Sequence, residues 1–254
     1  MKTTISVLAA AAFLLTATAG AQDAVPSTSL YPSPPPPATP RIVEVPKVAE
    51  TKLPNGLRVL GVSRPGSGLV TVQLLMRSGA ADDPAGKNGR ASMVAELLTK
   101  GTKTRSATQI ADGIEQIGAS LGAGAGYDST SVTLSVLKSR LDAAMPIFAD
   151  VVQNPTFPAG ELDRLRKQTL DDLSVSYRQP GTLARLVAAR ALYGGAPYGN
   201  SVVGTPQTLG KISRADLGDW HRSLFQPAQS VLIVSGDISA EEVSAMAARY
   251  LGTW

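Results

Sequence analysis

The fold can be worked out from one stretch of sequence, Gly89-Arg-Ala-Ser-Met-Val-Ala-Glu-Leu-Leu-Thr-Lys-Gly-Thr102. Its apolar residues Val94, Leu97 and Leu98 recur at the spacing of one side of a helix, and Gly101 completes the i, i+3, i+4, i+7 repeat. The opposite side carries small or polar residues at the same spacing: Ser92, Ala95, Glu96 and Thr99. The pattern predicts an amphipathic helix that ends at a glycine, the residue type favoured after helices.

Strands and helices alternate on both sides of this helix. Apolar runs bounded by turn residues predict strands at 57–63, 69–76, 129–138 and 230–235. Helical spacing of apolar residues predicts further helices at 107–117, 141–152, 160–177, 183–192, 214–225 and 240–250. This mixture predicts an α+β fold, a two-layer sandwich of one mixed β-sheet with helices packed on a face.

The N-terminal residues are predicted to be targeting and spacer segments. Lys2 precedes an apolar run at 5–15 that is too short to cross a membrane, and a small-residue cleavage site follows at 19–21. Residues 1–21 are therefore predicted to be a secretory signal peptide, with a retained membrane anchor as the alternative. The prolines of 22–48 predict an extended linker, or else a ligand for another domain, so the folded part is expected at 49–254.

Composition excludes several classes of function. The 254 residues include no cysteine, so no disulfide and no lipid-modified cysteine can form. The formal net charge of +4, or +3 without Lys2, is dispersed along the sequence, which argues against a nucleic-acid partner. The single histidine, His221, has no acidic residue one helical turn away and is predicted to pack or to lie at the surface. Because zinc sites draw on histidine, cysteine and carboxylates, a zinc hydrolase built from this chain alone is not expected.

The residues that frame the 89–102 helix resemble the metal-site helix of the pitrilysin/insulinase family of zinc metallopeptidases, which includes the mitochondrial processing peptidase. That helix carries H-x-x-E-H in a frame matched here by Gly89, Ala91, Leu98 and Lys100-Gly101-Thr102. Further short motifs extend the resemblance over residues 50–254: Leu53-Pro-Asn-Gly-Leu57, Ser78-Gly-Ala-Ala-Asp-Asp-Pro84, Phe157 with Glu161-Leu162, Ala196-Pro-Tyr-Gly199 with Gly204, Phe225 with Pro227, and Val234 with Gly236-Asp237. The resemblance implies an N-terminal domain whose C-terminal companion is absent, so the chain is expected to be truncated at Trp254 or to be half of a longer protein.

The zinc chemistry of that family is not expected here, because the resemblance places altered residues at its positions. Ser92 and Glu96 replace the two histidine ligands, and Ala95 replaces the general base. Asp172 stands at the third ligand, a glutamate in the family. A hydroxyl and two carboxylates suit Ca²⁺ or Mg²⁺ better than zinc, and alanine accepts no proton from water. We therefore expect no catalytic residue, no metal site and no cofactor. Glu96 and Asp172 are expected to be carboxylates that face a cavity.

A second segment of interest is Gly122, Ala123, Gly124 and Ala125. The resemblance aligns it with the edge strand that pairs with the substrate backbone in active members. Strand pairing uses main-chain groups, so these residues are predicted to bind a peptide substrate even without catalysis. A flexible turn is the alternative, because glycines weaken a strand.

The leading functional hypothesis is an exported, most simply periplasmic, non-catalytic subunit. It would pair with a zinc-bearing sister subunit and enclose peptides or unfolded polypeptides, as the processing peptidase pairs an active with an inactive subunit. The alternative is a structural or scaffold subunit of a larger complex with no role in proteolysis, by analogy with the respiratory-complex core subunits that resemble the family. A working site in the missing half of a longer protein is a third possibility.

Overall fold

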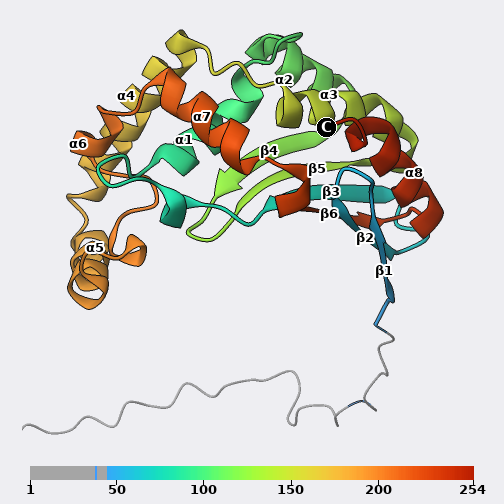
Figure 1. The fold of residues 1–254 in the computed structure, drawn as a ribbon, viewed down its shortest axis with the longest axis horizontal. Coiled ribbons are helices and arrows are strands. Elements are labelled where there is room, and N and C mark those ends of the chain that lie inside the picture. The colour runs from blue at the N-terminus through green and yellow to red at the C-terminus, as the bar shows by residue number, and fades with distance from the viewer. Residues whose placement is uncertain (1–37, 39–44) are drawn as a thin grey trace, which may run out of the picture. The chain divides into compact units, whose positions relative to one another are not determined.

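The computed structural model describes Ala38 and residues 45–254. In it, six strands form one mixed sheet in the order β1-β2-β6-β3-β5-β4 (Figure 1). The strands are β1 (Val48–Lys52), β2 (Arg58–Ser63), β3 (Leu69–Met76), β4 (Ser120–Ala125), β5 (Thr130–Leu137) and β6 (Ser230–Gly236). Only β2 and β6 run parallel; the other neighbours in this sheet are antiparallel.

Most of the helices form a second layer on one face of this sheet. The helices of the described residues are α1 (Arg90–Leu97), α2 (Ala107–Gln116), α3 (Leu141–Gln153), α4 (Ala159–Ser176), α5 (Pro180–Tyr193), α6 (Pro206–Leu209), α7 (Arg214–Leu224) and α8 (Ala240–Leu251). In Figure 1, α1, α2, α3, α7 and α8 lie above the sheet, whereas α5 lies apart from this layer, at the lower left. The predicted two-layer α+β sandwich is therefore confirmed.

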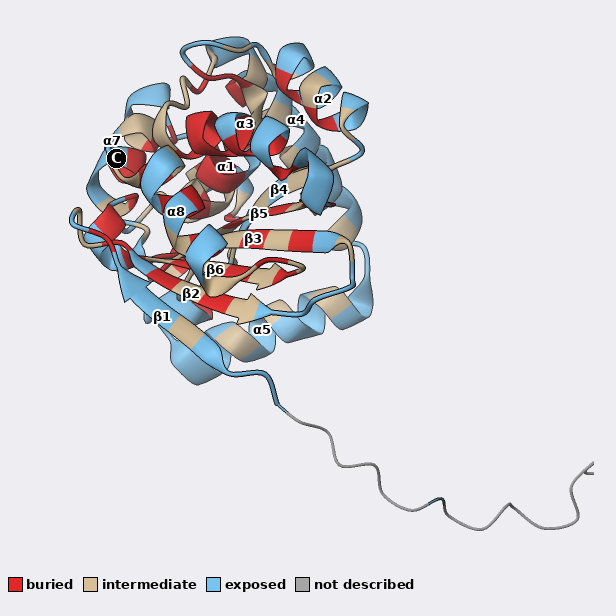
Figure 2. Ribbon diagram, turned by 90° about the vertical axis from the view of Figure 1, so that its right-hand side faces the viewer, coloured by how far each residue is buried: buried red, intermediate tan, exposed pale blue. Residues whose placement is uncertain are grey.

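Alternation along the strands explains why only one face of the sheet is packed. In β5, Val132, Leu134 and Val136 point toward the helices and are almost fully buried, while the residues between them are half-buried. The strands β3 and β6 alternate in the same way. Figure 2 shows the buried positions between the sheet and the helices. Burial of this apolar face is the main force that holds the two layers together.

Local sequence signals account for most element boundaries. Ser106, predicted as an N-cap, accepts a hydrogen bond from the backbone N–H of Gln109 (3.2 Å), and α2 follows it. The helix α5 begins at Pro180, three residues earlier than predicted. Proline suits the first position of a helix because its missing N–H would have no helical partner there. The pair Pro180-Gly181 therefore separates α4 from α5 without interrupting the second helix.

Residues 45–254 form one compact unit. The predicted signal peptide, 1–21, lies outside the described residues, as does most of the predicted linker, 22–48. In the described part of the chain, no helix combines the length and the apolar character needed to cross a membrane.

Candidate functional site

The helix α1 is positioned by close contact of Gly89, the residue just before it, with a distant loop. Gly89 has φ +98°, and a Cβ atom there would lie 2.7 Å from the carbonyl oxygen of Val203. Only glycine fits this contact without strain. At the other end, a short 3₁₀ turn, η2 (Leu98–Lys100), follows α1 and ends at Gly101, with φ +145°. The glycines of the sequence frame thus fix the start and end of this helix.

A buried carboxylate, Asp83, supplies the acceptor that the N-terminus of α1 needs. Its side chain accepts the N–H groups of Gly89 (2.9 Å) and Ala91 (3.0 Å) and is fully shielded from solvent. Burial raises the pKa of Asp83 to about 6, although the backbone donors and Arg90 oppose this rise. The carboxylate therefore caps α1 at a cost in desolvation.

The raised pKa of Asp83 predicts a pH-dependent stability. Between the ordinary pKa of 3.8 and about 6, the folded chain holds a proton that the unfolded chain has lost. The free energy of unfolding should therefore fall as pH rises through this window, by about 3 kcal/mol. Asp83→Asn should remove this slope in urea unfolding measured at several pH values, whereas Asp163→Asn, at a largely exposed carboxylate, should preserve it. An unchanged slope in the Asp83 variant would contradict the assignment.

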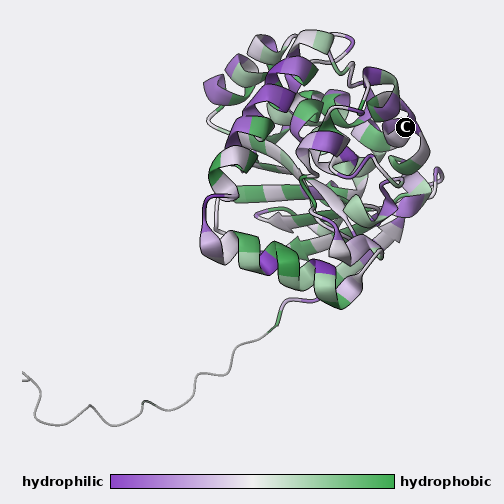
Figure 3. Ribbon diagram, turned by 90° about the vertical axis from the view of Figure 1, so that its left-hand side faces the viewer, coloured by the Kyte–Doolittle hydropathy of each residue, from purple (hydrophilic) through white to green (hydrophobic). Residues whose placement is uncertain are grey.

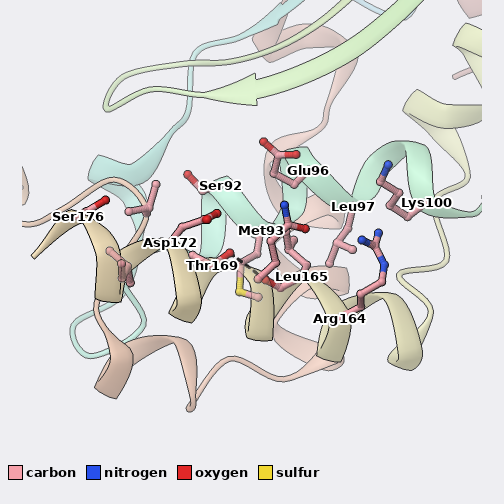
Figure 4. Close-up of a pocket in the computed structure, with 13 residues that line it drawn as sticks. Ser92, Met93, Glu96, Leu97, Lys100, Arg164, Leu165, Thr169, Asp172 and Ser176 are labelled. Carbon is pink, nitrogen blue, oxygen red and sulfur yellow. Dashed lines mark hydrogen bonds between the residues drawn. The ribbon is translucent and has the colours of Figure 1, made fainter.

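The helices α1 and α4 enclose a pocket of about 460 Å³. Ser92 and Glu96 reach it from α1, and Asp172 reaches it from α4 (Figure 4). The structure thus brings together the three positions that the sequence aligns with zinc ligands. The other lining residues are Met93, Leu97, Lys100, Arg164, Leu165, Gln168, Thr169, Leu173, Ser176 and Val203.

The three aligned positions differ in their surroundings. The Ser92 hydroxyl donates a hydrogen bond to the carbonyl oxygen of Val202 (3.1 Å). Glu96 and Asp172 are exposed. Ala95, placed by the repeat on the same side as Ser92 and Glu96, is instead 1% exposed. The small and polar side of this helix is therefore not uniformly open, because α1 packs against β4 and neighbouring elements closely enough to bury Ala95.

The donor groups at the three aligned positions do not fit zinc. They are a hydroxyl already bonded to a backbone carbonyl and two carboxylates, with no nitrogen or sulfur ligand. Across the described residues, no three His, Cys, Asp or Glu side chains lie close enough to hold a metal ion. The pocket can offer hydrogen bonds and charge to a polar ligand, but no assembled metal centre.

His221 lies elsewhere and has a packing role. Its Nε2–H donates to the carbonyl oxygen of Val152 (2.8 Å), and its ring packs against Phe157 and Phe225. Burial lowers the pKa of His221, so the imidazole is neutral at physiological pH. The histidine therefore lies outside the pocket between α1 and α4.

The segment 122–125 belongs to the strand β4, at the edge of the sheet. Gly126 donates its N–H to the Ser129 carbonyl (2.8 Å), which sets the phase of the β4–β5 ladder. Alternate residues bond to β5, so Ala123 and its alternate neighbours direct their N–H and C=O groups to the open edge. No described strand pairs with that edge. The predicted strand, rather than the turn, is thus observed, beside α1.

Sequence reasoning did not identify several residues of the pocket. Leu165, Thr169 and Ser176 share a face of α4 with Asp172, at helical spacing that would have revealed them once Asp172 was chosen. Val203 comes from a loop more than a hundred residues from α1, and no local pattern signals its approach.

Comparison with known proteins gives matches over most of the folded part. The family described as Insulinase (Peptidase family M16) matches residues 58–206, and the Peptidase M16 inactive domain matches residues 211–254. An uncharacterized zinc protease of Mycobacterium leprae is 29% identical over 81% of this chain and 46% of its own length. A probable mitochondrial-processing peptidase subunit beta of Arabidopsis thaliana is 28% identical over 80% and 38%. The cytochrome b-c1 complex subunit 1 of Caenorhabditis elegans is 30% identical over 83% and 44%.

Solved structures of peptidase M16 proteins also match this chain. A peptidase M16 inactive domain from Pseudomonas fluorescens is 29% identical with a TM-score of 0.77, covering 80% of this chain and 50% of that one. The periplasmic protease PqqL from Escherichia coli shares the fold, with a TM-score of 0.75 at 22% identity over 83% of this chain and 24% of its own. The chain spans about half the length, or less, of the curated relatives it matches.

Proposed function

The chain belongs to the insulinase family (peptidase family M16), and on that premise we propose that it is an exported, non-catalytic member that binds peptides in partnership with a zinc-bearing sister subunit. In this proposal Ser92, Ala95, Glu96 and Asp172 mark a zinc site that has been lost. The peptide binds along β4, at Gly122, Ala123, Gly124 and Ala125.

One observation carries the proposal: the three positions aligned with the zinc ligands of the family line one pocket but include no histidine. Ser92, Glu96 and Asp172 converge from two helices, yet they supply only oxygen donors. Ala95 cannot act as a general base. An active site whose positions are retained without ligand or base supports a binding role rather than hydrolysis by this chain.

Peptide binding is supported by the open edge of β4. Its outward main-chain groups provide the same hydrogen bonds to any extended peptide, whatever the side chains. The exposed Gly122 and Gly124 leave the outer side of this strand unobstructed, because a Cβ on either would meet no atom within 4 Å. Specificity for unfolded or extended segments follows from such a surface.

Export and partnership rest on the resemblance to relatives. PqqL is a periplasmic protease, and a processing-peptidase subunit is among the relatives. A chain without its own zinc ligands contributes to proteolysis only beside a subunit that has them. Co-purification of an H-x-x-E-H-bearing sister chain from the periplasm would support this part of the proposal, and recovery from the cytoplasm without such a chain would contradict it.

The decisive prediction concerns Ala123, whose N–H points to the open edge. Ala123→Pro removes that donor without removing a ladder bond, as proline on a sheet edge permits. We expect it to weaken binding of a fluorescently labelled, reduced and carboxymethylated protein at least about tenfold in anisotropy titrations. Ala123→Ser, which keeps the N–H, should bind as the wild type does.

The same preparations test catalysis. The isolated wild type should contain no stoichiometric zinc by elemental analysis and should leave the labelled polypeptide uncleaved. Stoichiometric zinc with cleavage, or equal binding by the proline and serine variants, would overturn the proposal.

A structural role in a larger complex is the second candidate, favoured by the 30% identity to cytochrome b-c1 complex subunit 1. It predicts a chain recovered in a membrane complex with no H-x-x-E-H subunit, and no peptide binding by β4. Native gel electrophoresis of solubilised membranes, followed by identification of the co-migrating chains, distinguishes the two.

A further inference from the structure

A second cavity lies in the helical layer, between α7 and the loop that joins α3 to α4. Its volume is about 620 Å³, and its walls come from 103, 153–157 and 214–222. All three segments belong to the compact unit, so this part of the chain forms the cavity by itself. None of the residues that line the pocket between α1 and α4 lines this one. A cavity of this size suits a small ligand.

The charged residues around this cavity have one sign. Lys103, Arg214 and Arg222 line it, and no aspartate or glutamate of the described residues does. Hydrophilic residues of several kinds occur along the outer side of the helical layer (Figure 3), and the pocket between α1 and α4 mixes carboxylates with cations. Outside the lining residues, Asp219 pairs with Arg222, and such an exposed pair is weak. Cations gathered around a concave site attract anions into it.

Both arginines are held by one part of the guanidinium group and keep a donor open. Arg214 donates from Nε (3.1 Å) and Nη2 (2.9 Å) to the carbonyl oxygen of Thr156, which fixes its direction. Arg222 donates from Nη2 to Asp219. The Nη1 group of each arginine has no hydrogen-bond partner among the described residues. A guanidinium N–H group donates readily to the oxygens of phosphates and carboxylates.

Gly218 keeps the space between these arginines open. Residues 214, 218 and 222 follow at i, i+4, i+8 along α7, so they lie on one face of the helix. A Cβ on Gly218 would lie 3.2 Å from Nη1 of Arg222, so this guanidinium lies over the glycine. Side chains of a helix lean toward its N-terminus, and this lean brings Arg222 toward Arg214.

The loop between α3 and α4 brings the third cation to the same space. The backbone N–H of Lys103 donates to the carbonyl oxygen of Asn154 (3.0 Å), two residues before Thr156, which holds Arg214. Phe157 follows with φ +47°, and it is the only non-glycine residue of the described chain in the left-handed region. Strained backbone of this kind occurs most often at functional sites, where the surrounding contacts fix it. Lys103 and Arg214 are thus both anchored to one short segment.

We propose that this cavity binds a small oxyanion, a ligand that carries a phosphate or carboxylate group. Arg214 and Arg222 donate to it through their open Nη1 groups, and the ammonium group of Lys103 adds a third cation. The inference does not depend on the proposed function, because neither β4 nor the pocket between α1 and α4 contributes a residue to this cavity.

Calorimetric titration of the whole chain tests the proposal, with inorganic phosphate in one series and citrate in another, in a buffer of low ionic strength. We expect a dissociation constant of about 1 mM or lower for at least one anion, and the tighter one identifies the preferred group. Arg222→Gln and Lys103→Gln should each weaken binding about tenfold. Arg249→Gln removes the same charge from an exposed arginine of α8 and should leave binding unchanged. Circular dichroism checks that each variant is folded.

A neutral substitution separates the cavity from its charge. Gly218→Leu places a side chain in the space between the arginines, where the flexible Arg222 side chain is the only neighbour within 4 Å. Leucine favours a helix more than glycine does, so α7 should persist. Binding should weaken at least about tenfold although no charge changes. Binding of neither anion below about 10 mM, equal losses in the Arg222→Gln and Arg249→Gln variants, or unchanged binding by Gly218→Leu would overturn the proposal.

Discussion

Replacing Asp150 with alanine is expected to lower the free energy of unfolding by about 3 kcal/mol. The carboxylate is 8% exposed and accepts hydrogen bonds from the hydroxyls of Thr102 and Thr104, both at 2.6 Å, and from Arg105 at 2.7 Å. Alanine would leave these donors without their acceptor, and the buried hydroxyl of Thr102 could not turn to water instead. Urea unfolding at neutral pH, followed by circular dichroism, measures the loss.

A matched control lies on the same helix, α3. Asp142 is largely exposed, and its contact with Arg249 spans 3.8 Å. Asp142→Ala should therefore change the free energy of unfolding by less than about 0.5 kcal/mol. Equal losses in the two variants would mean that burial of Asp150 contributes nothing, and the structural interpretation of its hydrogen bonds would be wrong.

Acid provides an independent readout of the same carboxylate. Burial raises the pKa of Asp150, but hydrogen bonds from Thr102, Thr104 and Arg105 outweigh it and leave the pKa below its ordinary value of 3.8. A lowered pKa contributes stability that is present above 3.8 and is lost as pH falls through the folded value. The difference between wild type and Asp150→Ala should therefore shrink in strong acid. This trend is opposite in sign to that of Asp83.

The hydrogen bonds of Asp150 show what the residues that frame α1 do in the fold. Thr102 ties the loop after α1 to α3 through Asp150. Gly89 fits against Val203, and Gly204 fits against Asn88. Each of these residues serves packing or backbone geometry, and none supplies a ligand. A change at Ser92 or Glu96 therefore leaves the wall of the pocket in place.

The alternation of apolar residues was sufficient to predict the layers. Val132, Leu134 and Val136 have the period of a strand buried on one face, and the structure places them so. The local residues of 120–125 did not decide between the edge strand and the turn, because glycine and alanine give no periodic signal and the strand depends on pairing with β5. Pairing with β5, rather than the strand propensity of its own residues, makes this segment a strand.

Only those residues of the candidate site that align with the zinc ligands of the family could be predicted from the sequence. Ser92, Glu96 and Asp172 were chosen from sequence, and one pocket contains all three. The burial of Ala95 was not foreseen, because a helical repeat gives an angular position but not the depth of the neighbouring layer. The exposure of α5 was also unpredictable, since an apolar helix normally indicates a core.

The largest expected change in binding comes from restoring nitrogen ligands to the pocket. In the triple variant Ser92→His, Glu96→His, Asp172→Glu, two imidazoles one helical turn apart on α1 face a carboxylate from α4. Three such ligands make the set that zinc favours, with a fourth position open to water. We expect this variant to bind one zinc ion per chain, at least about a thousandfold more tightly than the wild type. Titration calorimetry and elemental analysis after dialysis measure the change.

Two further variants separate ligand geometry from mere histidine content. The double variant Ser92→His, Glu96→His lacks the longer carboxylate and should bind zinc more weakly than the triple variant, since Asp172 is one methylene shorter. Neither variant should cleave peptides, because Ala95 still provides no base. A folded triple variant that binds zinc no better than the wild type would mean that these positions do not converge closely enough to share an ion. Tight binding without cleavage would mean that the wall between α1 and α4 still has the geometry of a metal site, and that only the identity of its side chains separates this chain from its zinc-binding relatives.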